Sequence, residues 1–82
     1  MSEQQYQSKI IKDLELEGYF TIKIIKANKN GIPDILAIKD GMATFIEVKS
    51  KDGRVSEIQK YRIEQLKKYG ARAFVMQDGK TD

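Results

Sequence analysis

An Asp40-Gly41 dipeptide separates two apolar runs, residues 34–39 and 42–49. Asp-Gly strongly favours a two-residue β-hairpin, because both positions can take the positive φ angles that a type I′ turn requires. The two runs are therefore predicted to be antiparallel neighbours in a sheet. Such a short turn also sets which residues of the two strands face each other.

This hairpin brings two carboxylates together. With Lys39 opposite Met42, Asp34 and Glu47 each lie five residues farther out and become cross-strand partners. Directly opposed like charges destabilise a sheet, and burying a carboxylate costs free energy unless it is paired or binds a metal. A divalent cation between the two would remove the conflict. Side chains alternate along a strand, so Lys49 lies on the face of Glu47, beside that cation.

The remaining sequence predicts two helices and two further strands. Apolar spacings of three and four predict a helix over residues 3–17, and the β-branched, aromatic run 19–26 predicts a strand. A second helix is predicted over 57–69 and a last strand over 72–77. The order is αβββαβ, and the helical crossover before the last strand makes the four-stranded sheet mixed. We therefore expect one α/β domain over residues 1–82.

The composition limits the available chemistry. The chain has no cysteine and no histidine, which excludes disulfides, zinc sites of the usual kind and a histidine base. A metal would need carboxylate and carbonyl ligands, which favour Mg²⁺, Mn²⁺ or Ca²⁺. The net charge of +3 is a weak sign of a polyanionic partner, and a lysine-rich soluble surface is the better explanation on charge alone. No apolar run could cross a membrane and no secretory signal is evident, so we expect a cytoplasmic protein.

The motif residues resemble those of a nuclease superfamily. Gly31-Ile-Pro-Asp34 followed by Phe45-Ile-Glu-Val-Lys49 is similar to the PD-(D/E)xK motif. Over nearly its whole length the chain resembles the virus-type replication–repair nuclease domain, VRR-NUC. Other stretches similar to that domain are Glu3 in the first helix, Ser56-Glu-Ile-Gln59, and Leu66-Lys-Lys-Tyr-Gly70.

The resemblance implies a restriction-endonuclease-like core and a DNA endonuclease that uses Mg²⁺ or Mn²⁺, in a bacterial or phage-infected cell. It implies that Asp34 and Glu47 bind the metal, with the backbone carbonyl of Val48 as a further ligand. Lys49 would position or deprotonate the attacking water and stabilise the charge that develops on the phosphate. These roles agree with the chemistry of phosphodiester hydrolysis, which needs an activated water and charge stabilisation.

Two further site residues follow from the resemblance. Glu3 would contact the metal-bound water, and Gln59 would orient Lys49 or the scissile phosphate. A simpler interpretation of Glu3 is a first-turn glutamate favoured by the helix dipole. Gln59 could face solvent at the start of its helix, yet it lies four residues before Ile63 on the core-facing stripe. A buried amide at that position must find a hydrogen-bond partner.

The expected macromolecular partner is DNA, branched or in the form of a four-way junction, bound with low sequence specificity. Basic residues that flank the site in sequence are expected to contact its phosphates: Lys23, Lys26, Lys29, Lys51 and Arg54. Taken one at a time, each fits ordinary surface charge better.

We also expect a homodimer. One active site cuts one strand, whereas a symmetric junction presents two, and stand-alone members of the resembled family are similar to junction resolvases. Several apolar residues exceed what so small a core needs to bury: Ile22, Ile24, Ile25, Tyr61, Tyr69 and Phe74. They could form a self-complementary patch, or they could simply complete the core.

Two other functions fit the sequence. The chain could be a nucleic-acid-binding module that kept the fold without catalysis, or a small interaction or inhibitor protein with a fortuitous motif. The acidic residues argue against a pure binder, which gains nothing from directing Asp34 and Glu47 at phosphates. An interaction protein should bind no metal.

Overall fold

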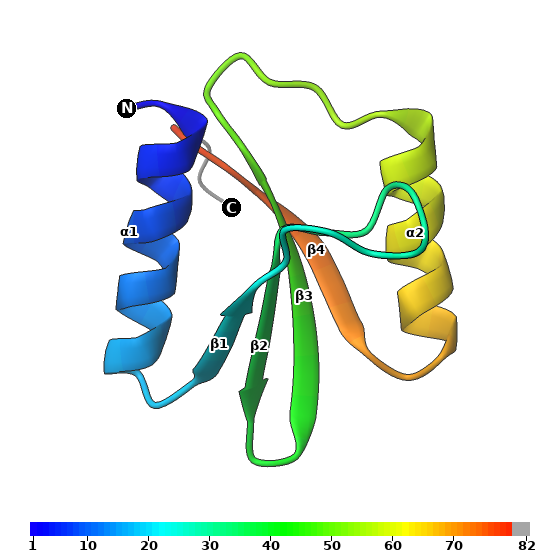
Figure 1. The fold of residues 1–82 in the computed structure, drawn as a ribbon, viewed down its shortest axis with the longest axis horizontal. Coiled ribbons are helices and arrows are strands. Elements are labelled where there is room, and N and C mark those ends of the chain that lie inside the picture. The colour runs from blue at the N-terminus through cyan, green and yellow to red at the C-terminus, as the bar shows by residue number, and fades with distance from the viewer. Residues whose placement is uncertain (80–82) are drawn as a thin grey trace.

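Two helices lie on opposite faces of a four-stranded sheet in the computed structural model, which describes residues 1–79 (Figure 1). The elements are α1 (Glu3–Leu16), β1 (Phe20–Lys23), β2 (Ile35–Lys39), β3 (Met42–Lys49), α2 (Glu57–Lys68) and β4 (Arg72–Gln77). The strand order is β1-β2-β3-β4, with β4 parallel to β3 and the other neighbours antiparallel. The predicted αβββαβ order and mixed sheet are confirmed. Neither helix is long and apolar enough to span a membrane, as far as residues 1–79 show.

The tight hairpin has the predicted register. Asp40 and Gly41 both have positive φ, 52° and 77°, as a type I′ turn requires. Lys39 is opposite Met42 and Ile35 is opposite Ile46. The turn chemistry therefore determines which face of β3 each side chain occupies.

Four elements have bounds that differ from the prediction. β1 is shorter than the run 19–26, because pairing ends once the Ile24 N–H has donated to the carbonyl of Asp34 at 2.7 Å and the chain leaves the sheet. β2 begins one residue after Asp34. The two helices each end one residue before the predicted end, since Glu17 and Tyr69 adopt cap conformations ahead of a positive-φ glycine.

The main core lies between α1 and the sheet. Ile10 of α1 packs with Ile35, Ile46 and Val48. Partly buried residues complete this layer: Tyr6, Ile11, Leu14 and Met76. The stripe predicted on α1 thus covers one face of the central strands, where each buried aliphatic side chain contributes about 1.5–3 kcal/mol.

The loop between β1 and β2 is docked on α2. Gly31 has a φ of 78°, and a Cβ added there would lie 2.8 Å from the Ile58 carbonyl oxygen. The Arg62 Nε–H donates to the carbonyl of Asn30 at 2.7 Å. These contacts hold the end of the loop against α2, so the chain approaches Asp34 from the side of that helix.

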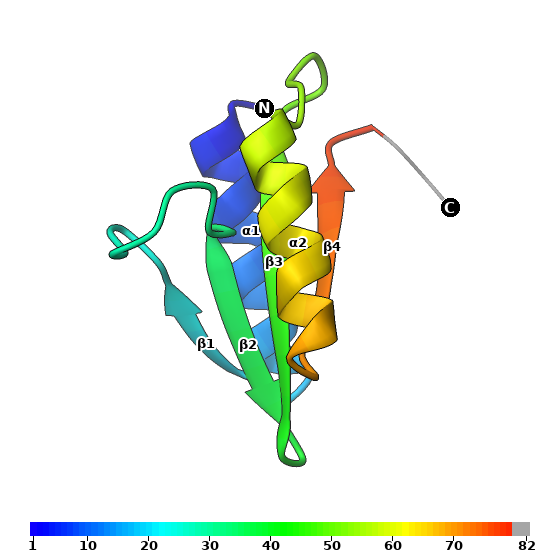
Figure 2. The same ribbon diagram turned by 90° about the vertical axis from the view of Figure 1, so that its right-hand side faces the viewer.

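α2 covers only part of its face of the sheet. It packs against β4, whereas α1 packs against β1 and β3. Figure 2 shows α2 in front of β3 and β4, with β1 and β2 to one side of it. By strand alternation Phe20 and Ile22 face this uncovered side, and both are exposed. We call this surface of Phe20 and Ile22 the open apolar face.

The contact of Gly31 with α2 can be tested with a matched pair of glycines. Gly31→Ala should lower the free energy of unfolding by more than Gly41→Ala, although the two glycines have nearly the same positive φ. Each pays the backbone strain of about 1–2 kcal/mol, but a Cβ meets nothing within 4 Å at Gly41. Urea unfolding measures both. Equal losses would show that the approach of Gly31 to Ile58 is not a constraint.

Candidate active site

Asp34 and Glu47 meet at the end of β2. The Asp34 N–H donates to the Ile46 carbonyl at 3.1 Å, although Ile46 is already paired with Ile35, so the regular pairing of β2 with β3 does not continue to Asp34. The Oδ2 atom of Asp34 accepts a hydrogen bond from the Val48 N–H at 2.8 Å. The side chain of Asp34 is thereby anchored to the backbone of β3, close enough to Glu47 for its carboxylate to raise the pKa of Glu47.

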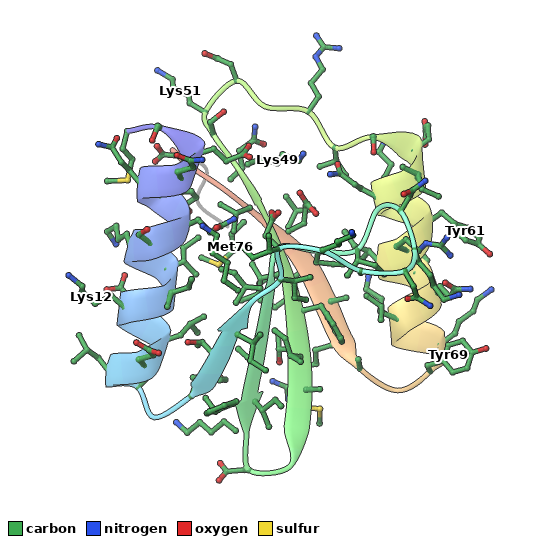
Figure 3. All side chains as sticks on the ribbon, in the orientation of Figure 1. Lys12, Lys49, Lys51, Tyr61, Tyr69 and Met76 are labelled. Atoms are coloured by element: carbon green, nitrogen blue, oxygen red, sulfur yellow. The ribbon has the colours of Figure 1, made fainter. Side chains whose placement is uncertain are left out.

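Glu47 is a carboxylate in the interior, with only 3% of its surface exposed. Its Oε2 atom lies 3.3 Å from the ammonium of Lys49 and accepts a hydrogen bond from the Gln59 Nε2 at 3.2 Å. Lys49 is itself largely buried. Figure 3 shows Lys49 near the carboxyl end of β3, between the two helices. A buried carboxylate with two donors satisfies the need for pairing that its position imposes.

Two effects act against each other on the charge of Glu47. Burial and the nearby Asp34 carboxylate raise the pKa of Glu47 from 4.5 to about 7, although the Lys49 ammonium lowers it. Burial is the larger cause, because a desolvated carboxylate favours its neutral form. A cation bound to Asp34 and Glu47 would favour the charged form of Glu47 and so counter the effects of burial and of Asp34.

The capping box of α2 determines how Gln59 reaches Glu47. The Gln59 Oε1 accepts a hydrogen bond from the Ser56 N–H at 2.9 Å, while the Ser56 side chain accepts from the Gln59 N–H. With its oxygen engaged, the amide NH₂ is directed at Glu47. The side chain does not face solvent, and its contact in the structure is Glu47, whereas the sequence interpretation had favoured Lys49 or a phosphate.

Glu3 contacts the backbone just after β3. Its Oε1 accepts a long hydrogen bond of 3.4 Å from the Ser50 N–H. Within residues 1–79, no three acidic side chains lie close enough to hold one metal ion together. The structure therefore brings Asp34, Glu47, Lys49 and Gln59 together, with Glu3 at the border.

The expected DNA-binding residues occupy different places. Lys26 and Lys29 line a groove of about 320 Å³ that ends at Asp34. Lys51 and Arg54 are exposed on the loop that follows Lys49 in the chain; Figure 3 shows Lys51 on this loop.

Lys23 differs from the other basic residues. It is the last residue of β1, at the edge of the sheet, and it does not line the groove that leads to Asp34. The structure therefore gives Lys23 less support as a DNA contact than Lys26 and Lys29.

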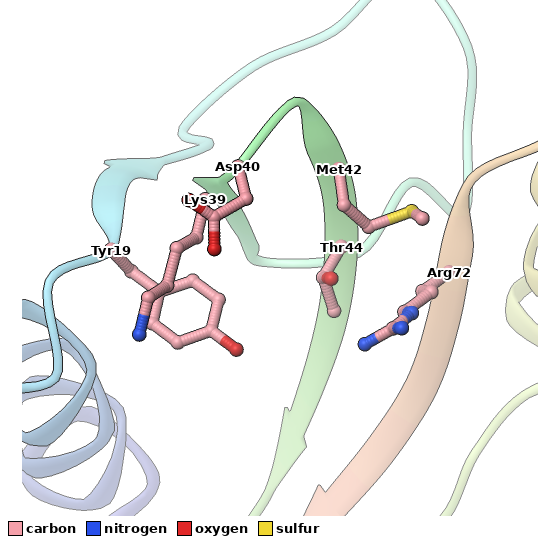
Figure 4. A pocket seen from close by; sticks show the side chains of 6 residues that line it. All are labelled: Tyr19, Lys39, Asp40, Met42, Thr44 and Arg72. Carbon is pink, nitrogen blue, oxygen red and sulfur yellow. The ribbon is translucent and has the colours of Figure 1, made fainter.

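A second pocket, of about 350 Å³, lies near the hairpin turn (Figure 4). Its lining residues are Tyr19, Lys39, Asp40, Met42, Thr44 and Arg72. The Lys39 ammonium donates to the carbonyl of Glu17 at 2.6 Å, so it already has a structural partner. No residue predicted for the active site lines this pocket, and Asp40 is its one carboxylate. It is not the candidate active site.

The donor atoms at Asp34 and Glu47 fit a hard divalent cation. Both side chains offer carboxylate oxygens, and the surrounding backbone offers carbonyls, the ligand types that Mg²⁺ and Mn²⁺ take. Burial and the charge of Asp34 raise the pKa of Glu47, and a bound cation would favour the charged form. These residues would hold one such ion.

A mixed αβββαβ core with this carboxylate pair and lysine at the end of the central strands defines a PD-(D/E)xK nuclease fold. The family model of the VRR-NUC domain matches residues 1–78. The chain therefore belongs to the VRR-NUC domain family.

Solved structures agree with this assignment. One described as a VRR-NUC domain has a TM-score of 0.77 and 28% identity, over 89% of this chain and 81% of that chain. Hjc, a Holliday junction resolvase from Archaeoglobus fulgidus, has a TM-score of 0.72 and 21% identity, over 90% of this chain and 66% of that chain. The second likeness is one of fold. No curated protein matches the sequence.

The raised pKa of Glu47 predicts an unusual pH dependence of stability. A folded-state pKa near 7 against 4.5 means that the folded protein binds the proton more tightly than the unfolded chain. Without metal, the resulting stabilisation is present below pH 4.5 and is lost as the pH rises through 7, up to about 3 kcal/mol. Urea unfolding in chelator from pH 4 to pH 8 should show this loss relative to Glu47→Gln. Parallel profiles for the two proteins would contradict the assignment.

Proposed function

We propose that this protein is a Mg²⁺- or Mn²⁺-dependent DNA endonuclease that hydrolyses phosphodiester bonds. The observation that carries the proposal is the buried Glu47, close to Asp34 and 3.3 Å from the Lys49 ammonium. Placing two carboxylates and a lysine together in the interior costs free energy. Metal-assisted hydrolysis would explain this arrangement, because the two carboxylates would bind the cation and the lysine would stabilise charge on the phosphate.

Asp34 and Glu47 would hold the cation, with the carbonyl of Val48 as a further ligand and Glu3 acting through a water molecule. The cation supplies a water of lowered pKa and screens the charge of the phosphate.

Lys49 would act on the attacking water and the phosphate, and Gln59 would orient the Glu47 carboxylate. The Lys49 ammonium carries a fixed positive charge beside Glu47, where it can orient the attacking water and stabilise charge developing on the phosphate oxygens. Gln59 holds the Oε2 atom of Glu47 through its amide. Because the capping box fixes that amide, the carboxylate remains oriented when DNA enters.

The groove from Lys26 and Lys29 to Asp34 supports a path for one DNA strand. Lys51 and Arg54 are exposed beyond Lys49, so phosphates on both sides of the scissile bond would find positive charge. Within residues 1–79, both helices pack against the sheet (Figure 1). We therefore propose structure-selective cleavage of branched or four-way junction DNA with low sequence specificity, which the fold shared with a Holliday junction resolvase supports.

The alternative is a non-catalytic nucleic-acid-binding module on the same fold. Such a module would favour lysines facing the DNA and has no use for a carboxylate whose pKa is raised by burial and Asp34. The retained arrangement of Asp34, Glu47 and Lys49 favours catalysis.

Cleavage of supercoiled plasmid and labelled four-way junctions with Mg²⁺ or Mn²⁺ tests the proposal. Lys49→Met keeps the apolar stem and removes the charge, so it should lower the cleavage rate by at least about 100-fold while calorimetry still detects Mn²⁺ binding. Glu47→Ala should lose the Mn²⁺ binding as well.

Lys12→Met is the matched control, because Lys12 is exposed on the outer side of α1 (Figure 3). It should cleave at the wild-type rate. A near wild-type rate in Lys49→Met would make that lysine merely structural. Salt-sensitive DNA binding by the wild type, without cleavage under any of these conditions, would establish the binding module instead.

We further propose a homodimer formed through the open apolar face. Of the apolar residues nominated for an interface, Ile22, Ile25, Tyr61, Tyr69 and Phe74 are exposed and do not complete the core. Ile24 is half-buried.

The exposed residues do not form one patch. β1 and β4 are at opposite edges of the sheet, so Ile22 and Phe74 lie far apart in the strand order. Figure 3 shows Tyr61 and Tyr69 on the side of α2 that faces away from the sheet. The open apolar face is the part next to the uncovered strands, and a second copy of the chain would cover it.

Light scattering at micromolar concentration should give a mass near two chains for the wild type and near one chain for Ile22→Lys. Phe74→Lys is the matched control, because Phe74 and Ile22 are 43% and 42% exposed on opposite edge strands. It should remain dimeric. A single-chain mass for the wild type, unchanged by branched DNA with Ca²⁺, would reject the dimer.

A further inference from the structure

Gln77, which the sequence analysis did not single out, closes the turn that follows the lysine strand. It is the last residue of β4 and lies beside Lys49 in the parallel register of β3 and β4. Its Nε2 donates to the carbonyls of Ser50 at 3.1 Å, Lys51 at 3.2 Å and Gly53 at 2.8 Å. One amide group thus gathers three carbonyls of a four-residue turn.

This turn lies against the side chain of Lys49. A Cβ built on Gly53 would be 3.4 Å from both the Cβ and the Cδ of Lys49, so the turn backbone already lies close to the aliphatic stem. The turn is also closed by the Gly53 N–H, which donates to the Ser50 carbonyl at 3.0 Å. The stem of Lys49 therefore has the sheet on one side and the turn near it on another.

We propose that Gln77 is a positioning residue for the reaction: its amide holds the Ser50–Gly53 turn against Lys49 and so directs the Lys49 ammonium at Glu47. The inference rests on the proposed nuclease function, because it concerns the placement of the proposed catalytic lysine. A lysine side chain has a flexible four-carbon stem and loses substantial rotamer freedom when it is held in one place. A packed turn supplies that restraint.

Other contacts keep the backbone in place when Gln77 is changed. The Asp78 N–H donates to the carbonyl of Lys49 at 3.0 Å, and β3 remains paired with β4. Glu3 accepts from the Ser50 N–H. Loss of the Gln77 amide should therefore loosen the turn and the Lys49 side chain without unfolding the sheet.

Gln77→Met tests the inference, because methionine keeps the length and apolar contact but cannot donate to the three carbonyls. Single-turnover cleavage of a four-way junction with Mg²⁺ should slow by about 10-fold to 100-fold, the effect of misplacing a reacting group by around an ångström. Junction affinity in Ca²⁺ and Mn²⁺ affinity should both stay within about 3-fold of wild type, since a 3-fold change is well under the 1.4 kcal/mol of a tenfold one. An equal loss of junction affinity would overturn the inference, because Gln77 would then act through DNA binding.

Gln65→Met is the matched control. Gln65 is a half-buried glutamine on α2 whose Oε1 accepts from the Arg62 guanidinium at 2.9 Å, so the same substitution also removes a side-chain hydrogen bond. It should leave the single-turnover rate unchanged. Equal slowing by both variants would reduce the effect of Gln77 to general destabilisation and overturn the inference.

A second measurement does not require catalysis. In the free protein, the ¹³Cε NMR signal of Lys49 should differ from those of the exposed lysines, and Gln77→Met should move it towards them. Faster amide exchange at Gly53 in the same variant would confirm that the turn has opened. An unmoved Lys49 signal despite an opened turn would overturn the inference even for an inactive protein, whereas absence of cleavage by the wild type rejects the nuclease function.

Discussion

Burial of the Glu47 carboxylate in the central strand is the constraint on which the rest of the site depends. An ionised group with 3% exposure is stable only where partners compensate for the lost water. The chain supplies two such partners: Lys49 on the same strand and Gln59 on α2. Burial and the negative charge of Asp34 still raise the pKa of Glu47, although Lys49 lowers it. This imbalance suits a site that takes up a cation.

The arrangement also explains why so small a domain needs all its elements. β2 and β3 place the carboxylates, and the capping box of α2 directs the Gln59 amide. The loop from β1 enters Asp34 along a path set by the contact of Gly31 with Ile58. β4 ends beside Lys49 and holds the turn that follows it. A change in any of these elements is therefore expected to alter the positions of the Asp34 and Glu47 carboxylates or of the Lys49 ammonium.

The two faces of the sheet serve different purposes. α1 covers one face completely enough to bury Ile10, Ile35 and Ile46 together. α2 covers the other face near β4 and leaves the side of β1 and β2 uncovered (Figure 2). The candidate site lies on this partly covered face, as the hydrogen bond from Gln59 to Glu47 shows. The same face carries the exposed apolar side chains of Phe20 and Ile22.

Local chemistry was enough to predict the centre of the site. Asp40-Gly41 selects a two-residue turn, the turn determines the register, and alternation along β3 puts Lys49 on the face of Glu47. β1 was predicted too long, because its apolar pattern continues to Ile25 although a strand ends where its neighbour stops pairing.

Contacts between distant segments were decided only by the tertiary structure. The partner of Gln59 depends on where α2 docks, and the contact of Glu3 with Ser50 depends on where α1 begins beside the loop after β3. Gln77 carries no local signal, because its three acceptors lie more than twenty residues away in the chain. Turn and strand preferences act between neighbours in sequence, whereas these contacts exist only once helices and strands have packed.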